Sequence, residues 1–272
     1  MTSEPAGVTG EIRFDDGATY ERYMGAWSQL AGAAFLEWLA PVRGARWLDV
    51  GCGSGAFTAM LVADCAPASV HGIDPSEAQL AYARTRLSAE VATFRQGDAM
   101  ALPYDDGAFD AAVMPLVIFF VPHPATGVAE MARVVSPGGT VSAYAWDMAG
   151  GGFPYHALQS EMRALGLTLP APPSPDSSRI DALQALWHGA GLADVETRAM
   201  VVQRTFESFD DYWTTILGGP SVRPTLLALP PADLALLQAR MRERLPADDA
   251  GRITYSATAN AVKGRVPGGS PK

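Results

Sequence analysis

The sequence predicts an α/β fold, a mainly parallel sheet with helices on both faces. Short apolar segments typical of strands alternate along the chain with helical segments, the order expected of such a sheet. The clearest example is the apolar segment Arg46–Val50, followed by glycines at Gly51, Gly53 and Gly55 and then by a helix over about 56–65. The chain has 272 residues, 48% of them hydrophobic, which is enough to build a sizeable core.

The glycine-rich loop predicts a site for a nucleotide-like cofactor. Glycine permits positive φ and lets a ligand approach the backbone, and the following helix presents unpaired N–H groups over the loop. Gly51, Gly53 and Ala56 fit the loose pattern of dinucleotide-binding loops. Asp49 argues against that interpretation, because a carboxylate two residues before the first glycine repels a pyrophosphate and suits a cationic amine.

Two sequence segments carry a family resemblance. LDVGCGSG at 48–55 resembles motif I of the class I S-adenosylmethionine-dependent methyltransferases, whose cofactor bears an ammonium and a sulfonium but no phosphate. GDAMALPYDDGAFDAAV at 97–113 resembles the ubiquinone/menaquinone-biosynthesis-like (methyltransferase type 11) group. The resemblance implies a Rossmann-like, seven-stranded sheet with an antiparallel last strand. It also implies S-adenosylmethionine as cofactor and S-adenosylhomocysteine as product.

Two further acids follow predicted strand ends. Asp74 ends a strand over about 68–73 and lies nineteen residues after Gly55, where a ribose-binding acid falls in nucleotide-binding α/β folds. The alternative is an aspartate that interacts only with the dipole of the next helix. Asp98 follows a strand over about 91–96, where it can accept from the adenine amine while a backbone N–H just after it faces a ring nitrogen. The predicted cofactor-binding residues are Tyr23, Asp49, Gly51, Cys52, Gly53, Asp74, Pro75, Asp98, Ala99, Met100 and Met114.

Tyr23 is predicted from the family, in which a segment before motif I often folds over the methionine end of the cofactor. Tyr20 and Arg22 are further candidates there, although the plainer interpretation is a helix packed on the sheet. Apolar spacing over 19–39 predicts two or three short helices, broken near Gly25 and Gly32.

His123 is the candidate catalytic base. It stands between two prolines at the start of a helix predicted over about 125–135, close to the transfer site in related enzymes. The alternative is a solvent-exposed residue at a helix N-terminus. An acidic phenol or thiol acceptor would lose its proton to solvent and leave His123 dispensable.

Several classes of function are disfavoured. A net charge of −9 argues against a nucleic-acid surface, and the Asp/Asn-Pro-Pro-Tyr/Phe element of amine-methylating enzymes is absent at Met114–Val117. No apolar run reaches the length of a membrane span, the start lacks the pattern of a secretion signal, and the two cysteines suggest reduced thiols. We therefore expect a cytoplasmic enzyme without a metal, monomeric or homodimeric, that acts on a small-molecule acceptor. The alternatives are a cofactor-binding protein without turnover and, less favoured, an NAD-dependent oxidoreductase.

The expected domain organisation is a single methyltransferase domain over 1–272. Its parts are a cofactor-binding core at 45–147 and 179–265, an N-terminal helical segment at 18–40 and a helical insertion or lid at 206–250. The Gly-, Pro- and Ser-rich stretch 149–178 is expected to be an insertion or a mobile loop. The aromatic residues Phe209, Tyr212 and Trp213 suggest that 206–250 helps to roof the acceptor chamber; the alternative is that they only attach the insertion to the sheet.

Overall fold

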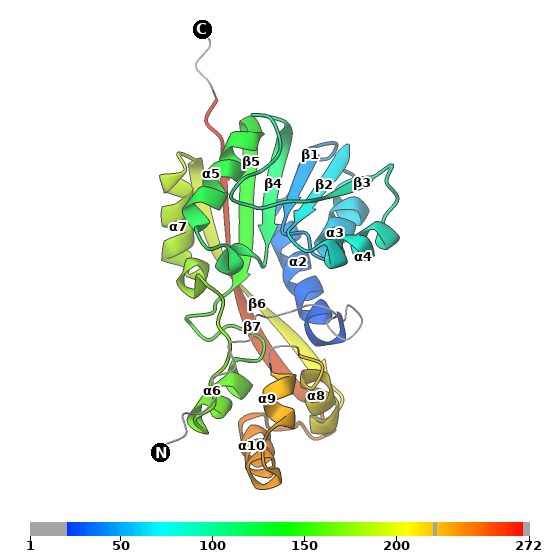
Figure 1. Cartoon of the computed structure of the whole chain (residues 1–272), viewed down its shortest axis with the longest axis vertical. Coiled ribbons are helices and arrows are strands. Elements are labelled where there is room, and N and C mark those ends of the chain that lie inside the picture. Colours follow the sequence, from blue (N-terminus) through cyan, green and yellow to red (C-terminus); the bar gives the residue numbers. More distant parts are fainter. Residues whose placement is uncertain (1–20, 220–221, 269–272) are drawn as a thin grey trace, which may run out of the picture. The chain divides into compact units, whose positions relative to one another are not determined.

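The computed structural model describes residues 21–219 and 222–268, and it contains a seven-stranded sheet (Figure 1). Its strands are β1 (Arg46–Val50), β2 (Ser69–Asp74), β3 (Ala92–Gln96), β4 (Phe109–Pro115), β5 (Val135–Trp146), β6 (Ala193–Phe206) and β7 (Ile253–Arg265). They lie in the order β3-β2-β1-β4-β5-β7-β6. The pairs among β1 to β5 are parallel, whereas β7 runs antiparallel to β5. The predicted mainly parallel sheet with an antiparallel last strand is confirmed.

Strand register brings the predicted acids to one edge of the sheet. Val50 pairs with Ile73 across β1 and β2, and Asp74 pairs with Gln96 across β2 and β3. Because these strands are parallel, the loops that leave their carboxyl ends share an edge, which is where such sheets bind ligands. The register thus supports the expectation drawn from the strand ends.

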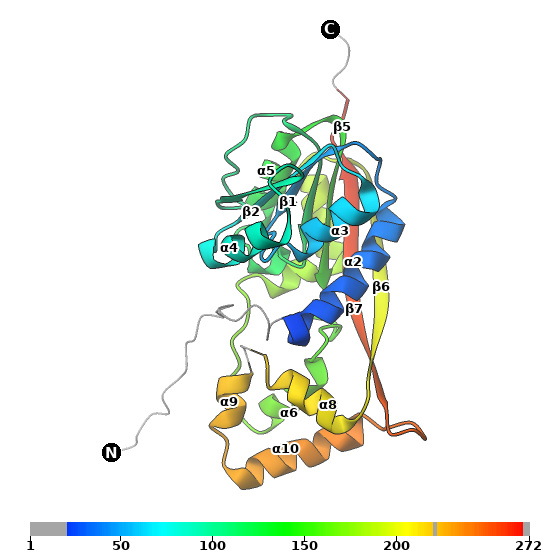
Figure 2. The same cartoon turned by 90° about the vertical axis from the view of Figure 1, so that its right-hand side faces the viewer.

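Helices cover both faces of the sheet. Figure 2 shows α2 (Ala26–Leu39), α3 (Ala56–Cys65) and α4 (Glu77–Arg86) on the near face, with α5 (Pro124–Val134) behind the sheet. α7 (Ile180–Gly189) packs beside α5 and is tied to β5 by the Trp187 indole N–H, which donates to the Val141 carbonyl at 2.9 Å. A short 3-10 turn at Ile118–Phe120 follows β4, and another at Pro175–Ser178 precedes α7.

The predicted break near Gly32 is wrong, since α2 runs through this position. A Cβ at Gly32 would lie 2.9 Å from the Met60 sulfur and 3.3 Å from the Phe57 ring, both on α3. The missing side chain therefore lets α2 lie directly against α3, a packing reason that helix propensity does not reveal. The segment Glu21–Gly25 before α2 forms a π-helical turn, and Tyr20 lies outside the described residues.

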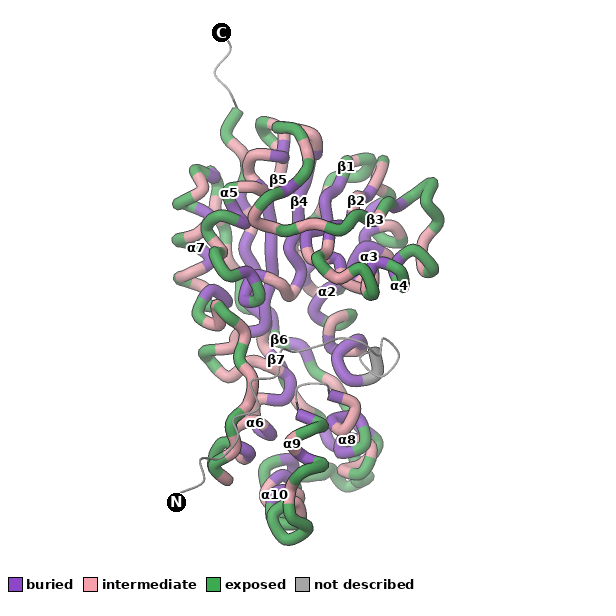
Figure 3. Tube along the Cα trace, viewed as in Figure 1, coloured by how far each residue is buried: buried purple, intermediate pink, exposed green. Residues whose placement is uncertain are grey.

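The chain divides into two compact units. The larger unit comprises residues 27–153, 172–202 and 256–272, of which the structure describes those up to 268; the smaller comprises residues 1–26, of which it describes those from 21 on, together with 154–171 and 203–255. Figure 3 shows buried residues concentrated along the central strands of the larger unit. The single-domain organisation predicted from the sequence stays a prediction.

The smaller unit joins three segments that are distant in the sequence. Its helices are α6 (His156–Ala164), α8 (Phe209–Ile216), α9 (Arg223–Leu227) and α10 (Pro231–Arg244). The Tyr23 and Tyr155 rings stack with centroids 4.3 Å apart, and the Tyr155 hydroxyl donates to the Tyr23 carbonyl at 2.6 Å. Glu161 on α6 pairs with Arg240 and Arg244 on α10. Residues 23–26 of the N-terminal segment, residues 154–171 and the 206–250 insertion therefore belong to one compact unit.

Candidate cofactor site

The loop between β1 and α3 has the backbone that its glycines suggest. Gly51 and Gly53 have φ values of +75° and +51°, in the left-handed region that disfavours side chains. A Cβ at Gly51 would meet the Val117 methyl groups at 2.5 and 2.6 Å, so this glycine permits the segment after β4 to close against the loop. A Cβ at Gly53 would meet nothing within 4 Å. Open space above Gly53 is what a ligand lying on the loop requires.

Asp49 is a buried carboxylate with one oxygen left without a donor. Its side chain has no exposed surface, and its Oδ2 accepts a hydrogen bond from the Thr58 hydroxyl at 2.6 Å. Its Oδ1 has no hydrogen-bond partner among the described residues. Burial raises the pKa of Asp49 to about 7; the Thr58 hydrogen bond opposes this rise, and the nearby Asp74 carboxylate adds to it. The Asp49 carboxylate is therefore suited to bind a cationic ligand.

Thr58 was missed by the sequence analysis. It lies in the first turn of α3 and is fully buried. A single hydroxyl in the otherwise apolar start of a helix was the available signal, but it does not say which strand residue it faces. Only the packing of α3 over β1 brings it to Asp49.

Asp74 ties two loops of the site together. Its Oδ2 accepts from the Gly53 N–H at 2.9 Å, and its Oδ1 accepts from the Ser76 N–H at 2.8 Å. Burial raises the pKa of Asp74, although both hydrogen bonds act in the opposite direction. Each carboxylate oxygen has two acceptor sites, so the group retains capacity for ribose hydroxyls. Pro75 lies in the same turn, and its carbonyl accepts from the Gln96 side chain at 2.9 Å.

Cys52 serves the packing of this loop. The residue is 6% exposed, and its sulfur would lie 2.8 Å from a Cβ at Gly72 on β2. Burial raises the pKa of its thiol, so the group stays protonated and is a poor nucleophile. The loop is also tied to β2 by the N–H groups of Gly51 and Cys52, which both donate to the Ile73 carbonyl, at 2.7 and 3.1 Å.

The turn after β3 places Asp98 at the same edge of the sheet, on the surface. Its Oδ1 accepts from the Met100 N–H at 2.8 Å, and it pairs with Ala101 in an isolated bridge. Because the Met100 N–H is engaged within the turn, the Ala99 N–H becomes the better candidate to face an adenine ring nitrogen. The adenine role of this turn stays a prediction.

Three predicted site residues are not part of these loops. Met114 is fully buried on β4, and its methyl group would lie 3.7 Å from a Cβ at Gly127 on α5. His123 is exposed at the N-terminus of α5, where its carbonyl accepts from the N–H groups of Thr126 and Gly127. Tyr23 is buried in the smaller unit. The proposed roles of these three residues stay predictions.

A strained residue after β4 escaped the sequence analysis. Leu116 has φ of +59°, uncommon for a residue with a side chain, and its N–H donates to the Tyr144 carbonyl at 2.7 Å. This reversal precedes Val117, whose methyl groups lie over Gly51. Such strain costs on the order of 1–3 kcal/mol and is concentrated at functional sites. No signal in the sequence marks Leu116.

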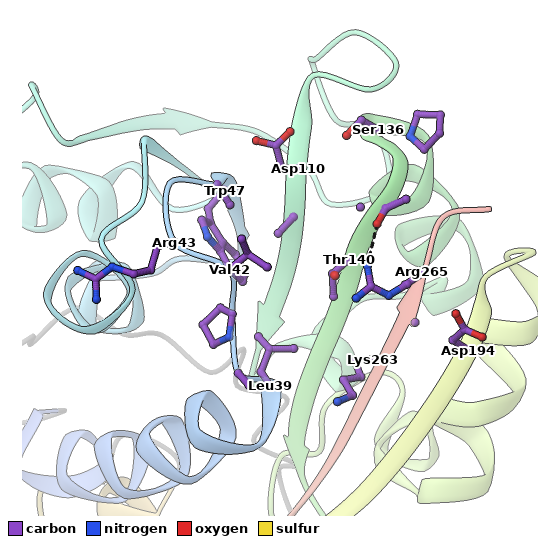
Figure 4. Close-up of a pocket in the computed structure, with 18 of the residues that line it drawn as sticks. Leu39, Val42, Arg43, Trp47, Asp110, Ser136, Thr140, Asp194, Lys263 and Arg265 are labelled. Atoms are coloured by element: carbon purple, nitrogen blue, oxygen red, sulfur yellow. Dashed lines mark hydrogen bonds between the residues drawn. The ribbon is translucent and has the colours of Figure 1, made fainter. Parts of the chain in front are cut away.

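The larger unit also contains a cavity of about 470 Å³ at the opposite, amino edge of its sheet (Figure 4). Figure 4 shows that its walls come from β4, β5, β6 and β7 and from the segment after α2. Among its charged side chains, Lys263 pairs with Glu196 at 3.4 Å, and Arg265 donates to the Gly138 carbonyl at 3.0 Å. None of the predicted cofactor-binding residues lines it, so the cavity is separate from the cofactor site.

Comparison with known proteins agrees with this geometry. Residues 48–143 match the model of a methyltransferase domain family. A demethylmenaquinone methyltransferase of Clavibacter sepedonicus is 38% identical over 114 residues, 42% of this chain and 46% of the relative. A fatty-acid O-methyltransferase of Mycolicibacterium smegmatis is 36% identical over 100 residues, 37% of this chain and 36% of the relative. The chain thus spans less than half the length of either relative.

Among solved structures, the YcgJ protein of Bacillus subtilis is similar in fold. It superposes with a TM-score of 0.61 at 17% identity, covering 88% of this chain and 99% of its own. This likeness shows a shared fold, and the strand order, the glycine loop after β1 and the acids at successive strand ends fit the class I S-adenosylmethionine-dependent methyltransferases that the sequence resembles. The match of residues 48–143 to a methyltransferase domain family agrees with the menaquinone-type resemblance of the sequence motifs.

Proposed function

We propose that this chain transfers the methyl group of S-adenosylmethionine to a small-molecule acceptor. When bound, this cofactor supplies a methyl group on a sulfonium that becomes a neutral thioether as the methyl leaves. The protein's own residues have to hold the amino-acid end and the nucleoside of the cofactor and to align the acceptor in a water-poor site.

The observation that carries the proposal is the orphaned oxygen of Asp49. A buried acceptor without a donor is costly, and a buried charge without a partner costs more. The ammonium group of the cofactor would supply both the donor and the opposite charge, and it would bring the pKa of Asp49 back down. A pyrophosphate in the same place would add a like charge, which disfavours the dinucleotide alternative.

The remaining contacts follow from the loops at the same edge. We assign the methionine end to Asp49 and the loop Gly51–Gly55, because the loop offers open space above Gly53. Asp74 would accept from the ribose hydroxyls with its spare lone pairs, and Asp98 with the Ala99 N–H would face the adenine.

A small apolar or aromatic acceptor is supported by the relatives rather than by the site. The two sequence relatives described above are named for a demethylated menaquinone and for fatty acids as substrates. The described part of the chain has no helix that is both long and apolar enough to cross a membrane. A purified-metabolite screen against labelled S-adenosylmethionine would identify the acceptor and the methylated atom.

The smaller unit is our candidate for acceptor selection. The cofactor contacts are the same in every such enzyme, so variable segments have to choose the acceptor. Within this unit Phe209 stacks on Trp213 with ring centroids 5.8 Å apart, and Tyr212 is 1% exposed. The same packing would be seen if these aromatic residues only attached the insertion to the sheet.

Replacement of residues 209–217 by a short Gly/Ser linker separates these two interpretations. We expect S-adenosylhomocysteine binding to persist while methyl transfer is abolished or accepts a broader set of acceptors. A linker variant that keeps the wild-type acceptor profile at a near-normal rate would remove this unit from acceptor selection.

His123 is proposed as a base only for an acceptor that needs one. If His123 is the base, its loss should lower the methyl-transfer rate and change the dependence of that rate on pH. A His123→Asn variant with an unchanged pH–rate profile would leave the reaction without this base.

The experiment that tests the main proposal compares ligands by thermal shift and then by turnover. A ligand at about 100 times its Kd stabilises a protein by about 2.7 kcal/mol. We expect stabilisation by S-adenosylhomocysteine and not by NAD. Stabilisation by NAD alone would favour the oxidoreductase alternative, and binding without transfer to any acceptor in a metabolite extract would favour a protein without turnover.

A further inference from the structure

The turn that carries Asp98 is followed by an irregular segment, 101–108, with few backbone hydrogen bonds of its own. Within it the Tyr104 N–H donates to the Leu102 carbonyl at 2.9 Å, and the Ala101 N–H donates to the Asp98 carbonyl at 3.1 Å. These bonds shape local turns but do not attach the segment to the sheet. Something outside the segment has to fix where the adenine-facing turn lies.

Besides Arg95 on β3, whose Nη1 donates to the Pro103 carbonyl at 3.2 Å, two side chains of α5 provide that attachment. Glu130 and Arg133 stand one turn apart on this helix. The Leu102 N–H donates to Glu130 Oε2 at 2.8 Å, and the Leu102 carbonyl accepts from Arg133 Nη2 at 2.9 Å. Both backbone polar groups of Leu102 are thus held by side chains of one helix.

Arg133 extends the attachment further along the segment. Its Nη1 donates to the Tyr104 carbonyl and to the Asp106 carboxylate, each at 2.8 Å. The Gly107 N–H donates to the Arg133 carbonyl at 3.0 Å, so the backbone of the same residue holds the far end.

The two side chains also order each other. Arg133 Nε donates to Glu130 Oε1 at 2.7 Å, and Nη2 donates to Glu130 Oε2 at 2.8 Å, a two-point pairing. The exposed fractions are 32% for the Arg133 side chain and 21% for Glu130, against 80% for Asp106. The partly buried pair therefore holds Leu102 firmly, whereas the contact with Asp106 is open to solvent.

We propose that Glu130 and Arg133 are positioning residues for the adenine end of the cofactor, a role that rests on the proposed function. They act through segment 101–108 and need not touch the cofactor. Holding Leu102 and Tyr104 before the ligand arrives removes the ordering cost from binding and sets where Asp98 and Ala99 stand. The planar guanidinium reaches two carbonyls and two carboxylates at once, which a lysine ammonium cannot do in the same geometry.

This role is tested by measuring the affinity of two ligands for the wild-type protein and for variants of the two residues. The ligands are S-adenosylhomocysteine and S-inosylhomocysteine; in the second, a carbonyl replaces the adenine amine and the adjacent ring nitrogen N1 carries a proton. Wild type should prefer the adenine compound by at least about tenfold, because the Asp98 carboxylate would meet an acceptor in the inosine compound. Arg133→Lys and Glu130→Gln should reduce this preference to threefold or less, mainly by weakening the adenine compound.

Arg46→Lys is the matched control. Arg46 also makes a multiple hydrogen bond with a carboxylate, Asp110, but at the amino edge of the sheet. We expect this variant to keep the wild-type preference between the two ligands. In turnover, Arg133→Lys should raise KM for S-adenosylmethionine with kcat little changed.

The outcomes separate the inference from the proposed function. If Arg133→Lys and Glu130→Gln lower Tm yet keep the full adenine preference, the pair is only structural and the inference is overturned. If Arg133→Lys does not fold, Glu130→Gln, which retains the arginine, decides alone. A wild-type protein that binds neither compound would overturn the proposed function itself, and with it this role.

Discussion

The carboxylates at the two edges of the sheet have opposite surroundings. At the carboxyl edge Asp49 and Asp74 accept from hydroxyl and backbone N–H donors, and burial raises the pKa of both. At the amino edge Asp110 accepts three hydrogen bonds from Arg46, whose guanidinium holds the pKa of that carboxyl below its usual range. One edge keeps its negative charge uncompensated, and the other neutralises it.

The difference indicates where a cation is meant to bind. An acid with an arginine beside it is already satisfied, so a ligand gains little from it. An acid that is buried among neutral donors lowers the stability of the empty protein and strengthens the binding of a cationic ligand. The predictions that follow test this contrast between the edges.

The largest effect is expected from Asp49→Asn. Removing one partner of a buried ion pair costs about 3–5 kcal/mol, so S-adenosylhomocysteine should bind at least about a hundredfold more weakly by calorimetry. The empty protein should gain stability at pH 8, because the difference between a pKa of 3.8 and about 7 amounts to about 4 kcal/mol. The gain should shrink as the pH falls below about 7 and vanish below about pH 3.8, where the carboxyl is protonated in both the folded and the unfolded chain. An Asn variant that binds with wild-type affinity would contradict the role of the orphaned oxygen.

Asp74→Ala should have the next largest effect. It removes hydrogen bonds to a charged acceptor, about 1.5–3 kcal/mol each, and so at least about tenfold in affinity. It also frees the Gly53 and Ser76 N–H groups, which adds a loss of stability measurable in urea. If this variant binds S-adenosylhomocysteine as tightly as wild type while Asp49→Ala does not, Asp74 is not the ribose acid.

The pH dependence of binding should show Asp49 directly. Because the cation binds the ionised carboxylate, affinity for S-adenosylhomocysteine should rise with pH and level off above about 7. Below that point it should fall up to tenfold for each pH unit. Thr58→Val is the matched variant: it removes the hydrogen bond that lowers the pKa of Asp49, so the midpoint should move to higher pH. A flat profile between pH 5 and 8 would rule out Asp49 as the titrating group.

The smallest effect is expected at the amino edge. Asp110→Asn breaks an ion pair with side chains 48% and 40% exposed, and such pairs contribute about 0.2–1 kcal/mol. Chemical denaturation should register this modest loss, while the affinity for S-adenosylhomocysteine should not change. A loss of binding as large as that in Asp49→Asn would remove the distinction between the two edges.

The parts of the site that the sequence predicted are those encoded locally. Positive φ at Gly51 and Gly53 and the helix after them depend on a few adjacent residues. The meeting of Asp49 and Asp74 also follows, because parallel strands bring their carboxyl ends to one edge.

What only the tertiary structure decided are the partners that come from elsewhere in the chain. The packing of helices and loops sets three such contacts. These are the Thr58 hydroxyl on Asp49, the Val117 methyl groups over Gly51 and the Arg133 side chain on segment 101–108. The association of Tyr23 with Tyr155 in the smaller unit is of the same kind. Local sequence constrains φ, ψ and the pattern of burial. It does not determine the distance between residues far apart in the chain, because packing sets that distance.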